Sequence, residues 1–381
     1  MERTFWRERV ARAQAKRSVV WLSGVRRAGK TTLAKELSGG RYFDCELPRV
    51  RADLEDAELF LRRLGSGPVV LDEVHRLPNP SEVLKIAADH FPGSKVIATG
   101  SSTLAARSKF RDTLTGRKAE VWLTPMIGRD VVDFRTGDLD RRMLHGGLPP
   151  FFLGDAPDDD AFGEWVDSYW AKDLQELFVV EKKSAFFKLV ELLFRQSGGL
   201  FEAQSFTGPC ELSRQTVRSY LDILETTLLA TVLRPYSGGS THEIVHQPKV
   251  YMFDTGFIAY FRGWTSLRDE DRGLLLEHLV LGELQARFAR SAIHHWRDKQ
   301  KHEVDFVLTK GRGVQVTAIE CKATARAFDP AALTSFRKRY PEGRNLLVCL
   351  DAGAITARRI GPLEMEIVPY LALGDLLDAS P

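Results

Sequence analysis

The chain has few of the residues that hold small extracellular folds together. Its 381 residues include only four cysteines, which stand far apart at Cys45, Cys210, Cys321 and Cys349. No two of them form a C-x-x-C pair, which argues against a disulfide framework and against a zinc knuckle. We therefore expect a reducing, cytoplasmic environment.

Long apolar runs and a strong net charge are also absent. No segment approaches the length needed to span a bilayer, and the amino-terminal MERTFWRERVARAQAKR is charged where a secretory signal would be apolar. We expect no membrane partner. The formal net charge is only +3, so the whole-chain charge does not indicate a nucleic-acid binder and any basic surface must be local.

Short apolar runs alternate with helical stretches over residues 1–135. Four of these runs predict buried strands bounded by turn residues: 18–23, 68–73, 94–101 and 119–125. Buried strands that alternate with helices favour an α/β fold, in which a parallel sheet carries helices on both faces.

One segment matches the phosphate-binding motif G-x-x-x-x-G-K-[ST], namely GVRRAGKT at 24–31, between a strand and the helical TTLAKEL. The glycines let backbone amides face phosphate oxygens, and the helix N-terminus adds its positive end. Lys30 would reach the β- and γ-phosphates of ATP, and the Thr31 hydroxyl would bind Mg²⁺. The predicted ATP-binding residues of this segment are Gly24, Arg27, Ala28, Gly29, Lys30, Thr31 and Thr32.

The strand at 68–73 ends in two carboxylates, Asp72 and Glu73. Behind a phosphate-binding loop this is the Walker B pattern, in which Asp72 would belong to the Mg²⁺ shell. Glu73 would orient and deprotonate the attacking water, because hydrolysis needs a base in line with the γ-phosphate. Together the two motifs resemble those of AAA+ ATPases.

That resemblance implies two further catalytic positions. Ser101 follows the strand at 94–101 and would be sensor 1, which contacts the γ-phosphate or the water. Ser102 is nearly as good a choice, and either serine would serve equally as a helix N-cap. Arg117 precedes the fifth strand, where AAA+ proteins carry the arginine that reaches a neighbouring subunit's γ-phosphate. Arg107 and Arg111 compete with it for that role, and a solvated surface arginine is the alternative.

The carboxy-terminal third contains a second group of charged residues. Asp305 lies in the predicted strand 303–310, and Glu320 and Lys322 lie two residues apart on the next strand, so their side chains share a face. Glu277 belongs to the preceding helix, 272–290. This set resembles the PD-(D/E)XK nucleases, in which carboxylates such as Asp305 and Glu320 bind Mg²⁺ and the lysine assists the water. A surface hairpin with solvated charges is the alternative.

The middle of the chain predicts helices. A helical pattern runs from Phe162 to about Leu193, the helix at 186–198 follows, and Ser213 is a predicted N-cap before 214–225. The segment 227–237 would then form a β wing. Residues 186–262 therefore predict a winged-helix-like unit.

The order of parts resembles the bacterial and archaeal ATPase family with an AAA+ domain and a carboxy-terminal domain of unknown function numbered 4143. The matching segments are 24–33, 69–80, 98–102, 114–126, 145–150, 169–173, 253–261, 274–284, 295–308 and 319–323. The resemblance implies an AAA+ core at 1–135, a helical connector at 136–185, the winged-helix-like unit at 186–262 and a nuclease-like α/β domain at 263–381. No sensor 2 arginine is assigned.

These features together predict a homo-oligomeric ATPase that acts on DNA without sequence preference, as a translocase or a remodeller of branched DNA. A hexamer is what AAA+ resemblance implies, and metal-dependent DNA cleavage stays open. Arg214 and Arg218 are followed by Asp222 and Glu225, so the winged-helix-like unit would serve protein docking as readily as DNA. The alternative is a nucleotide-switched signalling or defence ATPase whose carboxy-terminal domain binds a partner and is not catalytic.

Overall fold

The computed structural model describes residues 2–100, 114–134, 136–175, 178, 180–238, 247–309 and 315–379. Within the first of these ranges and the start of the second, five strands form one sheet in the order β2-β3-β4-β1-β5, and all its neighbouring strands are parallel. These strands are β1 (Val19–Ser23), β2 (Tyr42–Asp44), β3 (Gly67–Asp72), β4 (Ser94–Thr99) and β5 (Lys118–Trp122). The parallel α/β core expected from the sequence is confirmed. The strand β2 was not expected.

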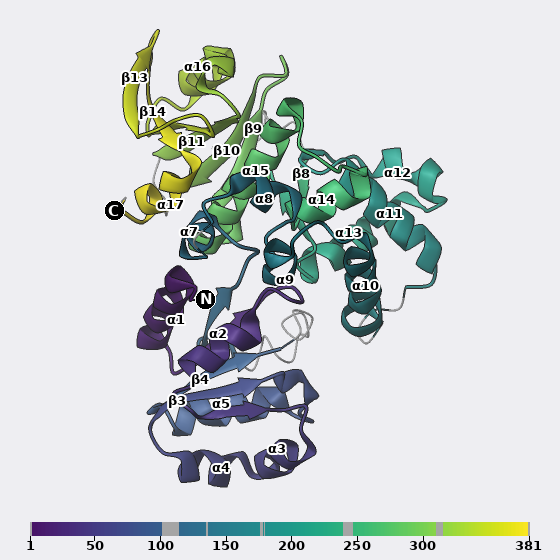
Figure 1. Ribbon diagram of the computed structural model, residues 1–381, viewed down its shortest axis with the longest axis vertical. Coiled ribbons are helices and arrows are strands. Elements are labelled where there is room, and N and C mark those ends of the chain that lie inside the picture. Colours follow the sequence, from purple (N-terminus) through teal and green to yellow (C-terminus); the bar gives the residue numbers. More distant parts are fainter. Residues whose placement is uncertain are drawn as a thin grey trace.

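Helices cover both faces of this sheet. They are α1 (Thr4–Lys16), α2 (Lys30–Leu37), α3 (Pro48–Asp53), η1 (Leu54–Asp56), α4 (Ala57–Leu64), η2 (Val74–Arg76) and α5 (Pro80–His90). Val20 and Leu22 pack on the face of α1 and α2, whereas Val19 and Trp21 pack on the face of α4 and α5. This alternation along β1 follows from the two-residue period of a strand. In Figure 1, α3 and α4 lie at the bottom, and α1 and α2 lie between the sheet and the rest of the molecule.

The middle of the chain is mostly helical. Its helices are α7 (Gly128–Asp133), α8 (Leu139–Leu144), α9 (Pro149–Leu153), α10 (Asp159–Tyr169), the π-helix η4 (Trp170–Leu174), α11 (Lys183–Arg195), α12 (Ala203–Cys210), α13 (Arg214–Thr226) and α14 (Thr255–Arg262). A small antiparallel sheet, β6-β8-β7, joins them, with β6 (Gly199–Leu200), β7 (Ala230–Leu233) and β8 (Lys249–Met252). The predicted N-cap is confirmed, because the Ser213 hydroxyl accepts a hydrogen bond from the Thr216 amide at 3.1 Å.

One helix expected in this part is interrupted. The predicted helical pattern from Phe162 to Leu193 is wrong as a continuous element, because η4 ends at Leu174 and α11 begins at Lys183. The interruption starts with a π turn, in which the Gln175 amide donates to the Trp170 carbonyl at 3.1 Å. A 3.6-residue apolar period does not reveal such a turn, since the buried side chains before and after it keep helical spacing.

A mixed sheet of six strands lies in the carboxy-terminal part of the described residues, in the order β13-β14-β12-β11-β10-β9. Its elements are α15 (Asp269–Arg287), η5 (Arg290–Ala292), β9 (Ile293–Arg297), β10 (Glu303–Thr309), β11 (Val316–Lys322), η6 (Ala325–Ala327), α16 (Pro330–Arg339), β12 (Asn345–Cys349), β13 (Thr356–Ile360), β14 (Leu363–Pro369) and α17 (Tyr370–Ala379). The expected α-β-β-α-β order is present, with β9 inserted after α15. The short IHHWR segment gave no clear alternation by which to predict it.

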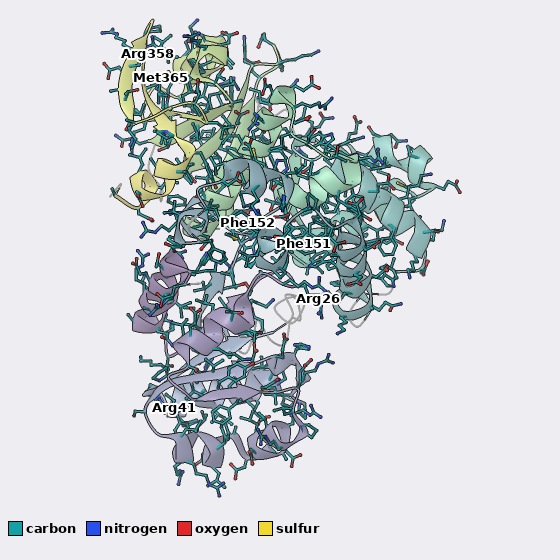
Figure 2. All side chains as sticks on the ribbon, viewed as in Figure 1. Arg26, Arg41, Phe151, Phe152, Arg358 and Met365 are labelled. Carbon is teal, nitrogen blue, oxygen red and sulfur yellow. The ribbon has the colours of Figure 1, made fainter. Side chains whose placement is uncertain are left out.

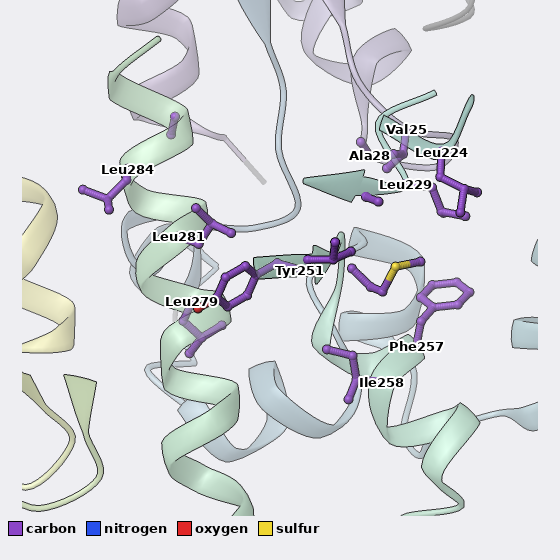
Figure 3. Close-up of a cluster of buried hydrophobic side chains, with 14 of the residues drawn as sticks. Val25, Ala28, Leu224, Leu229, Tyr251, Phe257, Ile258, Leu279, Leu281 and Leu284 are labelled. Atoms are coloured by element: carbon purple, nitrogen blue, oxygen red, sulfur yellow. The ribbon is translucent and has the colours of Figure 1, made fainter. Parts of the chain in front are cut away.

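One apolar core runs through the three parts. Figure 3 shows Val25 and Ala28 of the phosphate-binding loop near Leu224 and Leu229, with Leu281 on α15 in the same cluster. This cluster crosses the boundaries expected at 135, 185 and 262, whereas two further clusters lie wholly within residues 19–114 and 296–367. The boundaries stay predictions. No helix within the described residues has the length and apolar character needed to cross a membrane.

Candidate functional site

The phosphate-binding loop follows β1 and leads directly into α2. Gly24 and Gly29 have φ angles of 153° and 96°, which favour glycine, and a Cβ on Gly24 would lie 2.6 Å from the Leu123 carbonyl oxygen. The loop closes on itself, because the Lys30 ammonium donates to the carbonyls of Gly24 and Val25 at 2.8 and 3.0 Å. Burial lowers the pKa of Lys30, while the charges of Glu73 and Asp173 raise it.

The two carboxylates predicted at the end of β3 differ in their surroundings. Asp72 is 2% exposed; its carboxylate accepts hydrogen bonds from the Tyr42 hydroxyl at 2.5 Å and from the Thr99 hydroxyl. Glu73 adopts a left-handed φ of 54°, and its amide donates to Thr99 Oγ1 at 3.1 Å. Thr99 at the end of β4 therefore holds both residues. Thr99 was not among the site residues expected from the sequence, although it is the last residue of β4.

The Glu73 carboxylate is paired with a histidine. Its carboxylate lies 3.1 Å from His75 Nδ1. Burial alone would raise the pKa of Glu73, but the hydrogen bond with His75 and the charge of Lys30 outweigh it and hold the pKa below its ordinary value. The carboxylate is therefore ionised at neutral pH.

A cavity of about 300 Å³ joins these groups. One wall consists of the phosphate-binding loop, the start of α2 and Glu73, and another comes from the middle part of the chain. The lining residues are Gly24, Arg26, Arg27, Gly29, Lys30, Thr31, Thr32, Glu73, His75, Arg76, Gly100, Pro149, Pro150, Lys172 and Asp173. Arg26, His75, Arg76 and Gly100 belong to segments that carry predicted motifs but were not themselves predicted as site residues, and neither were the last four. Their only sequence signal was that HGGLPP and YWAKD stood among the matching segments.

The further catalytic positions implied by the AAA+ resemblance are sensor 1 and the arginine. Ser101, Ser102, Arg107 and Arg111 are outside the described residues. Arg117 Nε donates to the Asp89 carboxylate at 2.8 and 3.0 Å. Because β5 is parallel to β1 and Lys118 pairs with Val19, Arg117 lies at the edge of the sheet opposite the phosphate-binding loop. It could serve only a neighbouring subunit's site, and its role stays a prediction.

The carboxy-terminal charged residues also come together. The hairpin of β10 and β11 pairs Phe306 with Ile319, which brings Asp305 beside Glu320. Lys322 Nζ lies 3.2 Å from Glu320 Oε2 and 3.7 Å from Asp305 Oδ2. Burial, and next the charge of Asp305, raise the pKa of Glu277 to about 7 and also raise that of Glu320.

Strand β8 supplies a second lysine to this group. Glu277 Oε2 accepts a hydrogen bond from the Tyr251 hydroxyl at 2.8 Å and lies 3.5 Å from Lys249 Nζ. Lys249 Nζ is also 2.7 Å from Glu303 Oε1. Within the described ranges, no group of three or more His, Cys, Asp and Glu side chains is placed to hold a metal ion. Lys249 and Lys322 neutralise the carboxylates of Glu277, Asp305 and Glu320 only in part, because Lys249 is shared with Glu303 and the pKa values of Glu277 and Glu320 stay raised. The Mg²⁺ expected at Asp305 and Glu320 stays a prediction.

Comparison with known proteins assigns all three parts. A family model described as an AAA domain matches residues 16–132, one described as a domain of unknown function (DUF8612) matches 136–268, and another (DUF4143) matches 272–365. Uncharacterized proteins of Mycobacterium bovis and Mycobacterium tuberculosis are each 30% identical over 317 residues, which cover 80% of this chain and 70% of theirs. The chain belongs to this family of AAA and DUF4143 proteins.

Among solved structures, a Walker-type ATPase of Pyrococcus abyssi is similar, at 15% identity and a TM-score of 0.43, over 68% of this chain and 95% of that one. The matching family models and the two relatives confirm the resemblance expected from the sequence, at the level of the family and of its AAA domain.

In this AAA and DUF4143 protein the cavity fits ATP with Mg²⁺. The loop at 24–29, the ammonium of Lys30 and the N-terminus of α2 together form an anion-binding cradle. Thr31 lines the cavity beside them, and Asp72 is the last residue of β3, directly before the Glu73 that also lines the cavity. Hydroxyl and carboxylate oxygens are the ligands that Mg²⁺ prefers.

Arg3 connects the cradle to the rest of the protein. Its guanidinium donates to the Ala28 carbonyl at 2.8 Å and to the Asp130 carboxylate at 2.6 and 3.0 Å, and both side chains are buried. In the same region the Gly128 amide donates to Glu283 of α15 at 2.6 Å. The segment at 126–130 therefore lies between the phosphate-binding loop and the carboxy-terminal part.

We predict that Arg3→Ala destabilises the protein by about 3–5 kcal/mol, because it leaves the buried Asp130 carboxylate uncompensated. Arg7→Ala is the matched control, since its ion pair with Glu2 is exposed and should contribute only about 0–1 kcal/mol. The first unfolding transition in urea, followed by tryptophan fluorescence, measures both changes. Equal midpoints for the two variants would contradict the prediction.

Proposed function

We propose that this protein binds ATP with Mg²⁺, hydrolyses it, and uses the bound nucleotide to control how its AAA core contacts the middle part of the chain. The observation that carries the proposal is the composition of the cavity. Lys30, Thr31 and Glu73 line it from the AAA core, whereas Lys172 and Asp173 line it from η4. A ligand in this cavity would touch both parts at once.

Each catalytic role follows from the side chain's position. Lys30 would bind the β- and γ-phosphates, and Thr31 and Asp72 would hold the Mg²⁺, which supplies positive charge to the phosphates. Glu73, ionised and held by Thr99 through its amide, would orient the attacking water and take its proton. Ser101 as sensor 1 and Arg117 acting on a neighbouring subunit complete the proposal, and the second of these requires a homo-oligomer, for which a hexamer is the AAA+ precedent.

The carboxy-terminal part is proposed as a partner-binding element without catalysis. The carboxylates of Glu277, Asp305 and Glu320 form ion pairs with Lys249 and Lys322, and the Tyr251 hydroxyl of β8 donates to Glu277. This favours the nucleotide-switched ATPase over a nuclease.

Action on DNA is the second candidate. Its support is the exposed amino-terminal face of α13, which carries Arg214, Gln215 and Arg218 behind the N-cap Ser213. Arginines on such a face would contact phosphates without reading sequence.

One experiment separates the two candidates. We would measure the ATP hydrolysis rate with Mg²⁺, at one fixed salt concentration, without DNA and with single-stranded, duplex or four-way-junction DNA. Stimulation of several-fold that is lost in an Arg214→Ala, Arg218→Ala double variant, but kept in the exposed control Arg63→Ala, would support action on DNA. A measurable but unchanged rate favours the partner-binding switch. No hydrolysis under any condition would overturn the ATPase proposal.

A further inference from the structure

Asp173 is a carboxylate in the proposed ATP cavity that no step of hydrolysis requires. Its Oδ2 accepts a hydrogen bond from Arg26 Nε at 2.8 Å, and its side chain is only 9% exposed. Figure 2 labels Arg26 at the boundary between the AAA core and the parts above it. A buried carboxylate that faces a triphosphate is unfavourable unless a cation compensates it, and in this structure Arg26 provides that charge.

Arg26 and Asp173 lie near the end of the cavity where hydrolysis would occur. Glu73, the proposed base, and Lys30, the proposed ligand of the γ-phosphate, line the same cavity. The Lys30 ammonium donates to the carbonyls of Gly24 and Val25, the two residues directly before Arg26. The Arg26–Asp173 pair is therefore close to the position of the γ-phosphate, which ATP has and ADP lacks.

The pair connects the phosphate-binding loop to a particular segment. Asp173 lies in η4, whose π turn is a local irregularity of the kind frequent at functional sites. The backbone carbonyl of Arg26 also accepts a hydrogen bond, at 3.2 Å, from Trp165 Nε1 of α10. The side chain and the backbone of one loop residue thus both hold the α10–η4 segment.

This segment is in turn packed on the middle part of the protein. The Tyr169 hydroxyl is hydrogen-bonded to Thr227, which follows α13. The Trp165 ring stacks on Phe253, with 5.1 Å between the ring centroids and 16° between the planes. A shift of α10–η4 would therefore change the contacts at the end of α13 and just before α14.

We propose that Arg26 and Asp173 form a nucleotide-responsive latch, in which the γ-phosphate of ATP takes the Arg26 guanidinium from Asp173 and frees η4 from the phosphate-binding loop. Arginine suits this exchange, because its planar guanidinium bonds carboxylate and phosphate oxygens in the same way. ADP leaves the pair intact. The latch rests on the ATP binding proposed above, and it makes Asp173 a residue that determines the preference for ATP over ADP.

The test compares ATP and ADP affinities of the full chain by titration calorimetry with Mg²⁺. In Asp173→Asn the γ-phosphate no longer competes with a carboxylate, so ATP should bind roughly tenfold more tightly, as expected when one charge-assisted hydrogen bond need not be broken. The ADP affinity should stay unchanged. Asp167→Asn is the matched control, because Asp167 is an exposed carboxylate on α10, and it should behave as the wild type does.

Hydrogen exchange of the amides at 170–175 is the second measurement. If the ion pair had only a structural role, this exchange would not depend on which nucleotide is bound. ATP should raise this exchange in the wild type, ADP should not, and Asp173→Asn should exchange fast without nucleotide. If the wild type binds ATP but the ATP-to-ADP ratio is the same in Asp173→Asn, or exchange does not respond to ATP, the latch is wrong. If the wild type binds no ATP, the proposed function fails and the latch with it.

Discussion

Lys30→Ala is expected to remove tight ATP binding. The variant loses the one ammonium that faces the cavity from the start of α2, where it now bonds the Gly24 and Val25 carbonyls. Truncating one partner of a buried, hydrogen-bonded charge pair costs about 2–5 kcal/mol. The dissociation constant should therefore rise by roughly a hundredfold or more.

Titration calorimetry with ATP and Mg²⁺ measures the effect of Lys30→Ala. Lys35→Ala is the matched control, because Lys35 lies on the same helix with its side chain exposed and outside the cavity lining. A thermal melt of each variant distinguishes loss of binding from loss of folding. An unchanged ATP affinity in a folded Lys30→Ala variant would defeat the assignment of this cavity to ATP.

The sequence predicted well those parts of the site whose geometry depends on residues close together in the chain. The phosphate-binding loop consists of consecutive residues between a strand and a helix. Its motif and these two neighbours were therefore enough to predict it. Asp305 and Glu320 could likewise be placed side by side, since a hairpin fixes its register over a short distance. Both predictions needed only neighbouring residues and the period of the strand.

What the sequence did not reveal depends on tertiary packing. Asp173 reaches Arg26 from 147 positions along the chain, and Asp130 reaches Arg3 from 127 positions. Lys249 belongs to β8 and contacts a carboxylate on α15. A pattern of spacing cannot identify such pairs, because they form only when helices and sheets pack. For the same reason the sequence could suggest Asp305, Glu320 and Lys322 as one cluster but could not show that Lys249 joins it.

These long-range pairs also explain why the ATP cavity has a second wall. The AAA core supplies the cradle and the proposed base, yet Pro149, Pro150, Lys172 and Asp173 come from the middle part. Arg3 and the segment at 126–130 connect the opposite side of the loop to α15. The nucleotide site is therefore surrounded by contacts to the regions that a switch would have to move.

Glu73→Gln tests the chemical step separately from binding. Glutamine keeps the size of the side chain and a carbonyl oxygen for His75, but it cannot take a proton from water. We expect ATP to bind nearly as in the wild type, while the hydrolysis rate at saturating ATP falls by roughly 10²–10⁴-fold, the usual contribution of a general base. The steady-state rate of phosphate release and the dissociation constant of ATP measure the two effects.

The control for this variant is Glu36→Gln, which removes an exposed carboxylate from α2 and should leave both quantities unchanged. The backbone at Glu73 is held in its left-handed conformation by the Thr99 hydroxyl rather than by its own side chain, so the substitution should not disturb the Walker B strand. Turnover at the wild-type rate in Glu73→Gln would take the base role from Glu73. A variant that binds ATP and hydrolyses it slowly would instead hold the protein in its ATP-bound state. In that state the Arg26–Asp173 latch should be open, and hydrogen exchange of the amides at 170–175 should stay fast.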